Sequence, residues 1–524
     1  MRGLLLVALG ALWGCRASPQ TPGALLTALG ASPGGYLEGV PFALGEPLVL
    51  NREDFIYDAK LSPDSRFAAV SRLGMKSFHL SVHELTRPPT LRAEAAVNPL
   101  EFDVDALEFS PDGTRVAAVS RDGSLRIYAA ATGALVAAWL TEEPLVSLGW
   151  NASGSLLALG GAKGLVTVLA VPQMQHVAEL RPHTDEVRAV AFTPKDELVT
   201  AGWDQKLLVF ALTDAVSAPR EVRTHVTKKN GLVLFRGVLD RAASATIALD
   251  ERMPTLVVKS ALAQAIGIDT LRLTQTVAVP TAFGTQLAKL ARGRVLSIKN
   301  LTISEVDVAV CDACVPADAQ ALLGGPVLQQ LATAFDESSH EIVFTATPAA
   351  THVSLGSAQG LQLARAFTMP APVNDLSLDA KGAIAGVAMS VTKSERTKAV
   401  YDREKKHEVE PEREWDCGAR VDLSTGQVLE QRHGHHGVVA TVGISPDGQT
   451  LATGGWDKKV IVHGAQPLVE DPFGWAVRRV RFSRDGRRLI VAAWTPQNPL
   501  GSHSSDPSAV VYEVVYRAAS VTGR

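Results

Sequence analysis

The chain has 524 residues, more than one folding unit of roughly 100–200 residues can hold, so at least two units are expected. Hydrophobic residues make up 46% of the chain and charged residues 20%, a globular composition that excludes a disordered protein. The 51 Lys and Arg residues nearly balance the 54 Asp and Glu residues, and the resulting net charge of −3 argues against nucleic acid as a partner. Four cysteines are too few for a disulfide framework in a chain of this length.

The amino terminus has the pattern of an export signal. Leu4–Leu12 is an almost unbroken apolar stretch that follows a positive charge and is too short to span a bilayer. The next segment, Leu12-Trp13-Gly14-Cys15, resembles the lipobox of bacterial lipoproteins, although its tryptophan stands where a small residue is usual. The resemblance implies a signal and lipobox over residues 1–15, lipidation of Cys15, and a lipid anchor as the only membrane contact. We therefore expect a cell-envelope protein, periplasmic or anchored to the outer membrane. A signal peptide without lipidation is the alternative. Residues 16–46, rich in Pro, Gly and Ala, are expected to form a linker.

A short turn motif recurs along the rest of the chain. Phe109–Gly113 reads Phe-Ser-Pro-Asp-Gly, and Ile444–Gly448 differs from it only in the first residue. Pro fixes φ while Asp and Gly adopt turn conformations, so each copy closes a hairpin between two half-buried strands. With the weaker copies, the motif falls at positions 62, 110, 151, 193, 378, 445 and 483. Five of the six separations lie near or somewhat above the ~40–45 residues of a propeller blade. Because one such sheet cannot bury both its faces, we expect seven sheets arranged radially.

Two of the copies resemble WD repeats. Trp456-Asp457 follows His435 by 21 residues, and Val199–Lys206 repeats the phrase around that pair, with His183 upstream. In the family, the Asp, the His and a Ser or Thr form a hydrogen-bonded tether inside the blade. The resemblance therefore implies structural roles, as the tether aspartate for Asp122, Asp204 and Asp457, and as the tether histidine for His183 and His435. The Trp of the Trp-Asp pair that ends the family's repeat is absent here, and Tyr128, Phe210 and His463 stand at its position.

These patterns predict an all-β fold, a seven-bladed propeller with a small inserted domain. Blades one to four are expected over residues 47–221 and blades five to seven over residues 351–518. An early strand at Pro47–Asn51 is expected to close the ring beside the last strands near Ala509–Tyr516, because open sheet edges invite aggregation. The charged stretch Lys393–Arg413 is expected to be a solvated loop, or alternatively a docking loop.

The gap between positions 193 and 378 is about 140 residues longer than one blade, so residues 222–350 are expected to form a β-rich domain between blades four and five. The sequence predicts strands at Gly231–Leu239, Ala245–Leu249 and Leu256–Val258. Short helices are predicted at Lys259–Ile266 and Pro326–Ala332.

The inserted segment resembles the retropepsin-like aspartic proteases. Ile247-Ala248-Leu249-Asp250 aligns with their catalytic strand, and Leu322–Leu328 aligns with their Leu-Leu-Gly motif. The resemblance implies a small retropepsin-like β-barrel with Asp250 at the catalytic position. Glu251-Arg252 replaces the family's Thr/Ser-Gly, however, and the chemistry needs two close carboxylates that share a proton. We therefore expect an inactive site. A surface carboxylate paired with Arg252 is the plain interpretation of Asp250.

Cys311 and Cys314 form a Cys-x-x-Cys pair after an apolar strand. In an exported protein a local disulfide is the plain interpretation, with a redox couple or half of a zinc site as alternatives. Cys417 is left over as a buried or free thiol.

Without a catalytic constellation in the repeats, the sequence predicts a scaffold that binds a protein or peptide partner and needs no cofactor or metal. The alternative is an active, dimer-dependent peptidase that uses Asp250. A metal-dependent propeller enzyme ranks last.

Overall fold

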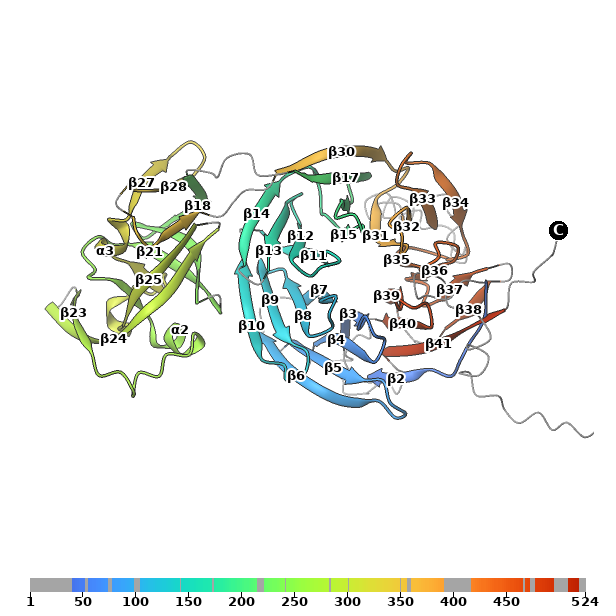
Figure 1. The fold of residues 1–524 in the computed structure, drawn as a ribbon, viewed down its shortest axis with the longest axis horizontal. Coiled ribbons are helices and arrows are strands. Elements are labelled where there is room, and N and C mark those ends of the chain that lie inside the picture. Colours follow the sequence, from blue (N-terminus) through green and yellow to red (C-terminus); the bar gives the residue numbers. More distant parts are fainter. Residues whose placement is uncertain are drawn as a thin grey trace, which may run out of the picture.

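The computed structural model describes residues 40–51, 55–73, 78–98, 104–141, 143–171, 174–213, 221–240, 242–281, 284–299, 301–348, 350–355, 360–390, 416–464, 467–471, 476–493 and 508–517. These residues form nine antiparallel or mixed sheets. Seven of the sheets surround a common centre, and the other two form a separate unit at the side of the ring (Figure 1). Among the residues described, no helix is long and apolar enough to cross a membrane.

Each sheet of the ring is a blade whose strands we name a to d from the centre outward. The first three blades are β3 (Phe55–Leu61), β4 (Phe67–Leu73), β5 (Phe78–Glu84) and β6 (Thr90–Asn98); β7 (Val104–Phe109), β8 (Arg115–Ser120), β9 (Ser124–Ala129) and β10 (Leu135–Leu140); and β11 (Leu145–Trp150), β12 (Leu156–Gly161), β13 (Val166–Ala170) and β14 (Gln175–Leu180). Blade four contains β15 (Ala189–Phe192), β16 (Leu198–Ala201), β17 (Lys206–Thr213) and β30 (Gly360–Thr368).

The last three blades follow the same plan. They are β31 (Val373–Leu378), β32 (Ile384–Met389), β33 (Cys417–Asp422) and β34 (Val428–Arg432); β35 (Val439–Ile444), β36 (Leu451–Gly455), β37 (Val460–His463) and β38 (Leu468–Glu470); and β39 (Val477–Phe482), β40 (Arg488–Ala493) and β41 (Ala509–Arg517) with β1 (Val40–Leu44) and β2 (Leu48–Asn51). Because neighbouring strands of a blade are antiparallel, all a–b turns lie at one end of the ring and all b–c turns at the other.

The amino-terminal strands close the ring. β2 pairs with β41 in an antiparallel register that sets Leu48 opposite Val511, and β1 pairs further along the same strand. The last blade is thus completed by the first described residues, which confirms the closure expected from the sequence. Because β1 and β2 pair with β41, the outer edge of β41 is covered.

The a–b turn of every blade is held by one polar side chain. In the best copy, Ser110 Oγ accepts the backbone N–H of Arg115 at 3.0 Å. The corresponding acceptors are the side chains of Ser62, Asn151, Thr193, Asp379, Ser445 and Ser483. In blade five the position is therefore Asp379, one residue later than the position 378 expected from the sequence, because the Asp379 carboxylate replaces the serine hydroxyl.

The inserted unit leaves the ring inside blade four. β30 pairs with β17 along its whole length, from Lys206 opposite Thr368 to Thr213 opposite Gly360. The expected position between blades four and five, with blade five beginning at 351, is therefore wrong: strand d of blade four follows the insert. The separation between turn motifs could not reveal this, because it does not depend on which side of strand d the extra residues lie.

The inserted unit has its own hydrophobic core, which includes Phe235, Ile247 and Phe344. Its elements are β18 (Glu221–His225), β19 (Thr227–Lys229), β20 (Leu232–Leu239), β21 (Ala243–Leu249), β22 (Leu256–Val258), α2 (Ser260–Ala265), β23 (Thr276–Thr281), β24 (Gly284–Ile298), β25 (Leu301–Val310), the 3₁₀ turn Asp312–Cys314, β26 (Ala321–Leu323), α3 (Gly325–Leu328), β27 (Leu331–Asp336), β28 (Glu341–Ala346) and β29 (Val353–Leu355). The second helix is shorter than predicted because Leu331 already begins β27, which pairs with β28.

The insert packs against the outer edge of blade two. β20 and β21 lie against β10, and Arg236 Nη1 donates to the Asp122 carbonyl at 3.2 Å. Figure 1 shows the inserted unit beside the part of the ring that contains β10 and β14. Lys299 of the insert lies 3.8 Å from Glu179 on blade three. Burial raises the pKa of Glu179, but His176 and Lys299 outweigh it and lower the value to about 2.

Candidate functional site

Blade four is tied internally by three polar side chains. His183 Nδ1 lies 2.9 Å from Asp204 Oδ1, and His183 Nε2 lies 2.8 Å from the Thr200 hydroxyl. These residues come from the loop before β15, from β16 and from the b–c turn, so the bonds join three segments of the blade. Burial lowers the pKa of His183 more than Asp204 raises it, so the imidazole is neutral and directs its proton toward the carboxylate.

Blade six repeats this tether and extends it by one residue. His435 Nδ1 lies 2.8 Å from Asp457, His435 Nε2 lies 2.8 Å from Thr453 Oγ1, and His463 Nε2 lies 2.7 Å from the same hydroxyl. In blade four the position of His463 is held by Phe210, which has no donor. Both tethers are structural, because every polar atom at their centres is already hydrogen-bonded.

Asp122 in blade two has different partners. Its carboxylate accepts the Ser124 N–H at 2.8 Å, the Ser124 hydroxyl at 2.5 Å and Arg126 Nη2 at 3.2 Å. The Asp122 carboxylate thus bonds to Arg126 on the following strand, whereas Asp204 and Asp457 bond to a histidine from before strand a. Burial opposes ionisation of Asp122, but the bonds from Ser124 and Arg126 lower its pKa.

Asp250 follows β21 and forms a two-point ion pair. Arg252 Nε lies 2.9 Å from its Oδ1 and Arg252 Nη2 lies 2.7 Å from its Oδ2. The hydrogen bond from Arg252 lowers the pKa of Asp250, so its carboxylate is ionised. No described acid forms a hydrogen bond with Asp250. The neighbouring Gly324 approaches the same turn so closely that a Cβ there would lie 2.2 Å from the Thr255 carbonyl.

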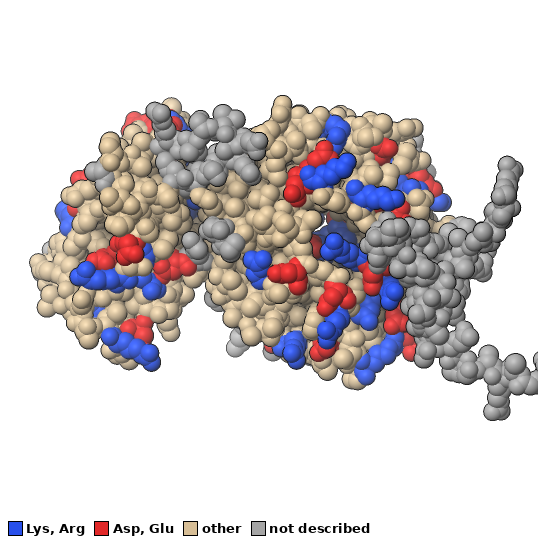
Figure 2. Space-filling view, in the orientation of Figure 1, with Lys and Arg blue, Asp and Glu red and all other residues tan. Residues whose placement is uncertain are grey.

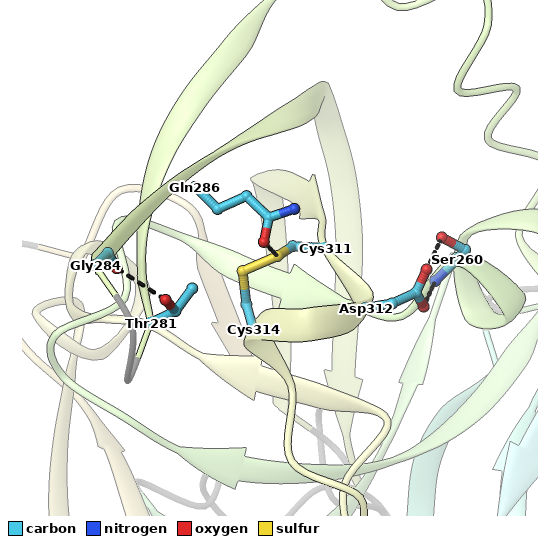
Figure 3. The surroundings of a disulfide bond; sticks show 7 residues. All are labelled: Ser260, Thr281, Gly284, Gln286, Cys311, Asp312 and Cys314. Atoms are coloured by element: carbon cyan, nitrogen blue, oxygen red, sulfur yellow. Dashed lines mark hydrogen bonds between the residues drawn. A yellow bond between two sulfur atoms is a disulfide. The ribbon is translucent and has the colours of Figure 1, made fainter.

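Cys311 and Cys314 form a disulfide at the end of β25 (Figure 3). Asp312, the first of the two residues between them, accepts hydrogen bonds from the Ser260 N–H at 2.8 Å and from the Ser260 hydroxyl at 2.5 Å. These bonds fix the loop to the start of α2. Cys417 is a free, buried thiol on β33, and burial raises its pKa to about 12. Cys15 and the charged stretch Lys393–Arg413 lie outside the described residues.

The centre of the ring holds a cavity of about 410 Å³ whose wall includes partly buried arginines. Figure 2 shows Lys and Arg side chains in the hollow at the centre of the ring. Arg479 Nε lies 2.5 Å from Asp58 Oδ1 in blade one, and Arg479 Nη1 lies 3.2 Å from Asp375 Oδ1 in blade five. Arg481 pairs with Asp375 as well, at 2.6 Å. Burial alone would raise the pKa of Asp375, but Arg481 and Arg479 hold it far below its usual range.

Blade seven is thus joined across the centre to blades one and five. We call this cavity the central channel. Sequence reasoning missed its arginines, although the run Val477-Arg478-Arg479-Val480-Arg481 carried a signal: three arginines stand where an innermost strand is normally apolar.

One residue at the start of strand a is displaced by a β-bulge in six of the seven blades. A bulge re-aims the extra side chain, and these residues lie at the start of the inner strands, at the end of the ring where the b–c turns lie. Among the six bulged residues, Val146 lines the cavity. Arg188 immediately precedes strand a of blade four. We name the set the mouth ring: Tyr57, Asp105, Val146, Arg188, Asn374, Ala440 and Arg478.

Two exposed tryptophans stand beside the mouth ring on equivalent b–c turns. Trp203 is 39% exposed and Trp456 is 53% exposed. Trp203 is fixed, because its Nε1 donates to Asn374 Oδ1 at 3.0 Å and the Arg188 guanidinium lies 5.3 Å from its ring centroid. The b–c end of the ring therefore presents rigid aromatic surface next to charged side chains.

Comparison with known proteins places repeats on these blades. The family model "WD domain, G-beta repeat" matches residues 99–129, 174–210 and 426–463. A segment of 71 residues is 41% identical to "Guanine nucleotide-exchange factor SEC12" of Rattus norvegicus, covering 13% of this chain and 17% of the relative. A segment of 73 residues is 36% identical to "Eukaryotic translation initiation factor 3 subunit I" of Phaeosphaeria nodorum, covering 13% and 22%.

The chain thus spans less than a quarter of the length of these relatives. The second and third matched segments each begin at or near strand d of one blade and end with strand c of the next, and the first covers strands a to c of blade two. The matches therefore coincide with the radial sheets, and the ring is a β-propeller in which three segments match the WD40 repeat.

Proposed function

We propose that the protein is a non-enzymatic scaffold that binds a protein or peptide at the b–c end of its propeller. The observation that carries this proposal is the pair of exposed tryptophans, Trp203 and Trp456, on one end of a rigid ring. Tryptophan and arginine dominate the binding energy of protein interfaces because they bury large areas with little loss of conformational entropy. Trp203 is already held in place by Asn374 and Arg188, so its immobilisation on binding costs little.

The inserted unit has a role in binding rather than hydrolysis in this proposal. β26 lies between β21 and β22, parallel to the first and antiparallel to the second, and this topology around Asp250 supports the resemblance to retropepsin-like proteases. Peptide hydrolysis would require Asp250 to share a proton with a second acid. Its carboxylate instead forms two hydrogen bonds with Arg252, which stabilise the ionised form that cannot hold that proton. The alternative of an active dimer needs this ion pair to break.

Export and lipid attachment through Cys15 belong to the same proposal. They are supported by the apolar Leu4–Leu12 stretch, and by the Cys311–Cys314 disulfide, since such bonds persist mainly in oxidising compartments.

An affinity-capture comparison tests the binding role. Trp203→Ala/Trp456→Ala is compared with the intact protein and with Leu91→Ala/Leu429→Ala, which removes exposed apolar side chains from the outer strands β6 and β34. Each protein is immobilised and exposed to the same cell extract, and the captured proteins are quantified by mass spectrometry. We expect a set of proteins that is captured by the intact protein and by the leucine variant and is lost with the tryptophan variant. Equal capture by all three proteins would contradict the proposal.

A further inference from the structure

Among the described residues of the mouth ring and its neighbours Arg121 and Glu186, the arginines outnumber the carboxylates that pair with them. Arg121 Nε lies 3.0 Å from Asp105 Oδ2 and its Nη2 lies 2.8 Å from Glu186 Oε1. Arg188 Nη1 lies 2.9 Å from the same Glu186 oxygen. Two carboxylates thus serve two arginines, and Arg478, the bulged residue of blade seven, forms no side-chain hydrogen bond or ion pair with any described residue.

The surroundings of Arg478 disfavour an isolated cation. Burial lowers the pKa of Arg478, and the charges of Arg188 and Arg479 lower it further against the weaker opposing effect of Asp105. A charge that is shielded from water and has no partner raises the free energy of the folded state, so such charges are rare unless a ligand pairs with them. The bulge that places Arg478 at the b–c end therefore lowers the stability of the fold, as expected of a residue that is kept for binding.

A second guanidinium at the mouth also has an unused donor. Arg188 Nε is buried and has no hydrogen-bond partner among the described residues. Its plane is fixed by the Trp203 ring on one side and by Glu186 at its terminal nitrogen. Two guanidiniums from blades four and seven therefore keep donors without a partner among the described residues, and they are near enough for the charge of Arg188 to lower the pKa of Arg478.

We propose that Arg478 and Arg188 bind the carboxylate of an Asp or Glu side chain that a partner peptide places between the inner strands at the b–c end of the ring. This inference rests on the proposed binding function and names the chemistry of the partner: one acidic residue flanked by apolar residues that pack on Trp203 and Trp456. One uncompensated arginine matches one monovalent carboxylate. A phosphate carries about −1.5 to −2 charges and would be repelled by Asp105 and Glu186 in the same opening.

Hydrogen bonds to charged groups contribute about 1.5–3 kcal/mol, which corresponds to roughly a ten- to hundredfold change in affinity. Arg478→Met keeps an unbranched apolar stem and removes the charge. The matched control is Arg487→Met, which removes an exposed arginine from the a–b turn of the same blade, at the other end of the ring.

The test is a selection from a phage-displayed library of random peptides on the full chain and on both variants. We expect the intact protein and Arg487→Met to enrich peptides with Asp or Glu at one fixed position, and Arg478→Met to lose that preference. Selected peptides should bind Arg478→Met about ten- to hundredfold more weakly, while their Glu→Gln versions should bind the intact protein and Arg478→Met equally. Enrichment of the same acidic position on Arg478→Met would overturn the proposal.

Additional measurements distinguish loss of folding, failure of this inference and failure of the proposed function. Because removal of an unpaired cation relieves repulsion, the thermal midpoint of Arg478→Met should stay at or above that of the intact protein, which shows that lost binding is not lost folding. Peptides that depend on the two tryptophans but show no acidic preference would overturn this inference alone. Selection of no peptide at the b–c end would overturn the proposed function as well. Displacement of the acidic peptides by free glutarate at similar concentration would assign the site to a small carboxylate instead.

Discussion

Acidification should loosen blade six through His463. This imidazole is 5% exposed, and its Nε2 must carry a proton to donate to Thr453 Oγ1, because the Thr453 hydroxyl is itself donated to His435. Burial is the main cause that lowers its pKa from 6.5 to about 3, and the positive charge of Arg432 lowers it further. The folded chain therefore binds this proton far more weakly than the unfolded chain does.

The sign and size of the effect follow from this difference. Because the folded pKa of His463 lies below the unfolded value, its contribution to stability is complete above pH 6.5 and is lost as the pH falls. One pKa unit corresponds to about 1.36 kcal/mol, so stability at pH 5 should be about 2 kcal/mol lower than at pH 7. Carboxylates with lowered pKa, such as Asp457, lose their contribution only at lower pH.

The assay is native-state hydrogen exchange of peptides from β36 and β37 at pH 5 and pH 7, corrected for intrinsic exchange rates. His463→Gln keeps an N–H donor for Thr453 but does not titrate, so we expect it to abolish most of the pH dependence in blade six. His463→Phe copies Phe210 of blade four and should lower stability at both pH values, since Thr453 then loses a donor. If the intact protein and His463→Gln lose the same stability between pH 7 and pH 5, the reasoning is refuted.

Three further predictions concern the ring, the insert and the amino terminus. Arg479→Met should lower the free energy of unfolding by about 3–5 kcal/mol, because two buried carboxylates lose a partner; a urea midpoint within error of the intact protein would contradict the cross-channel role. Reduction of Cys311–Cys314 should destabilise the insert by about 2 kcal/mol and leave the blades unchanged in hydrogen exchange, since the bond closes only a short loop; loss of protection in the blades would be the contrary result. Cys15→Ala should abolish incorporation of radiolabelled palmitate during growth in a bacterial host, and equal labelling of both chains would exclude Cys15 as the lipidated residue.

The repeats were predictable because their turns depend on local chemistry. A Ser-Pro-Asp-Gly turn specifies its own hydrogen bonds, as between Ser110 and Arg115, whatever the rest of the fold does. The number of blades follows from counting such turns, and the closing strand follows from the need to cover the last sheet edge. The tethers at His183 and His435 were predictable for the same reason, since their spacing within one repeat places them together.

Contacts between segments that are far apart in the chain could not be predicted from the sequence. β30 has no turn motif of its own, and only its pairing with β17 across the insert assigns it to blade four. The ion pairs of the channel arginines form only when the seven inner strands converge at the centre of the ring. Arg479 then contacts Asp58 and Asp375, which are 421 and 104 residues away in the sequence. The ion pair of Asp250 was likewise set by the folded geometry, although Arg252 was a visible candidate for its partner.

The central claim, that the protein binds without cutting, is tested most directly by a hydrolysis assay at mildly acidic pH. A pool of peptides is incubated with the intact protein and with Asp250→Asn, and new peptide termini are identified by mass spectrometry. We expect no new termini that depend on Asp250, because Arg252 forms two hydrogen bonds with its carboxylate. New termini produced by the intact protein and absent with Asp250→Asn would contradict it.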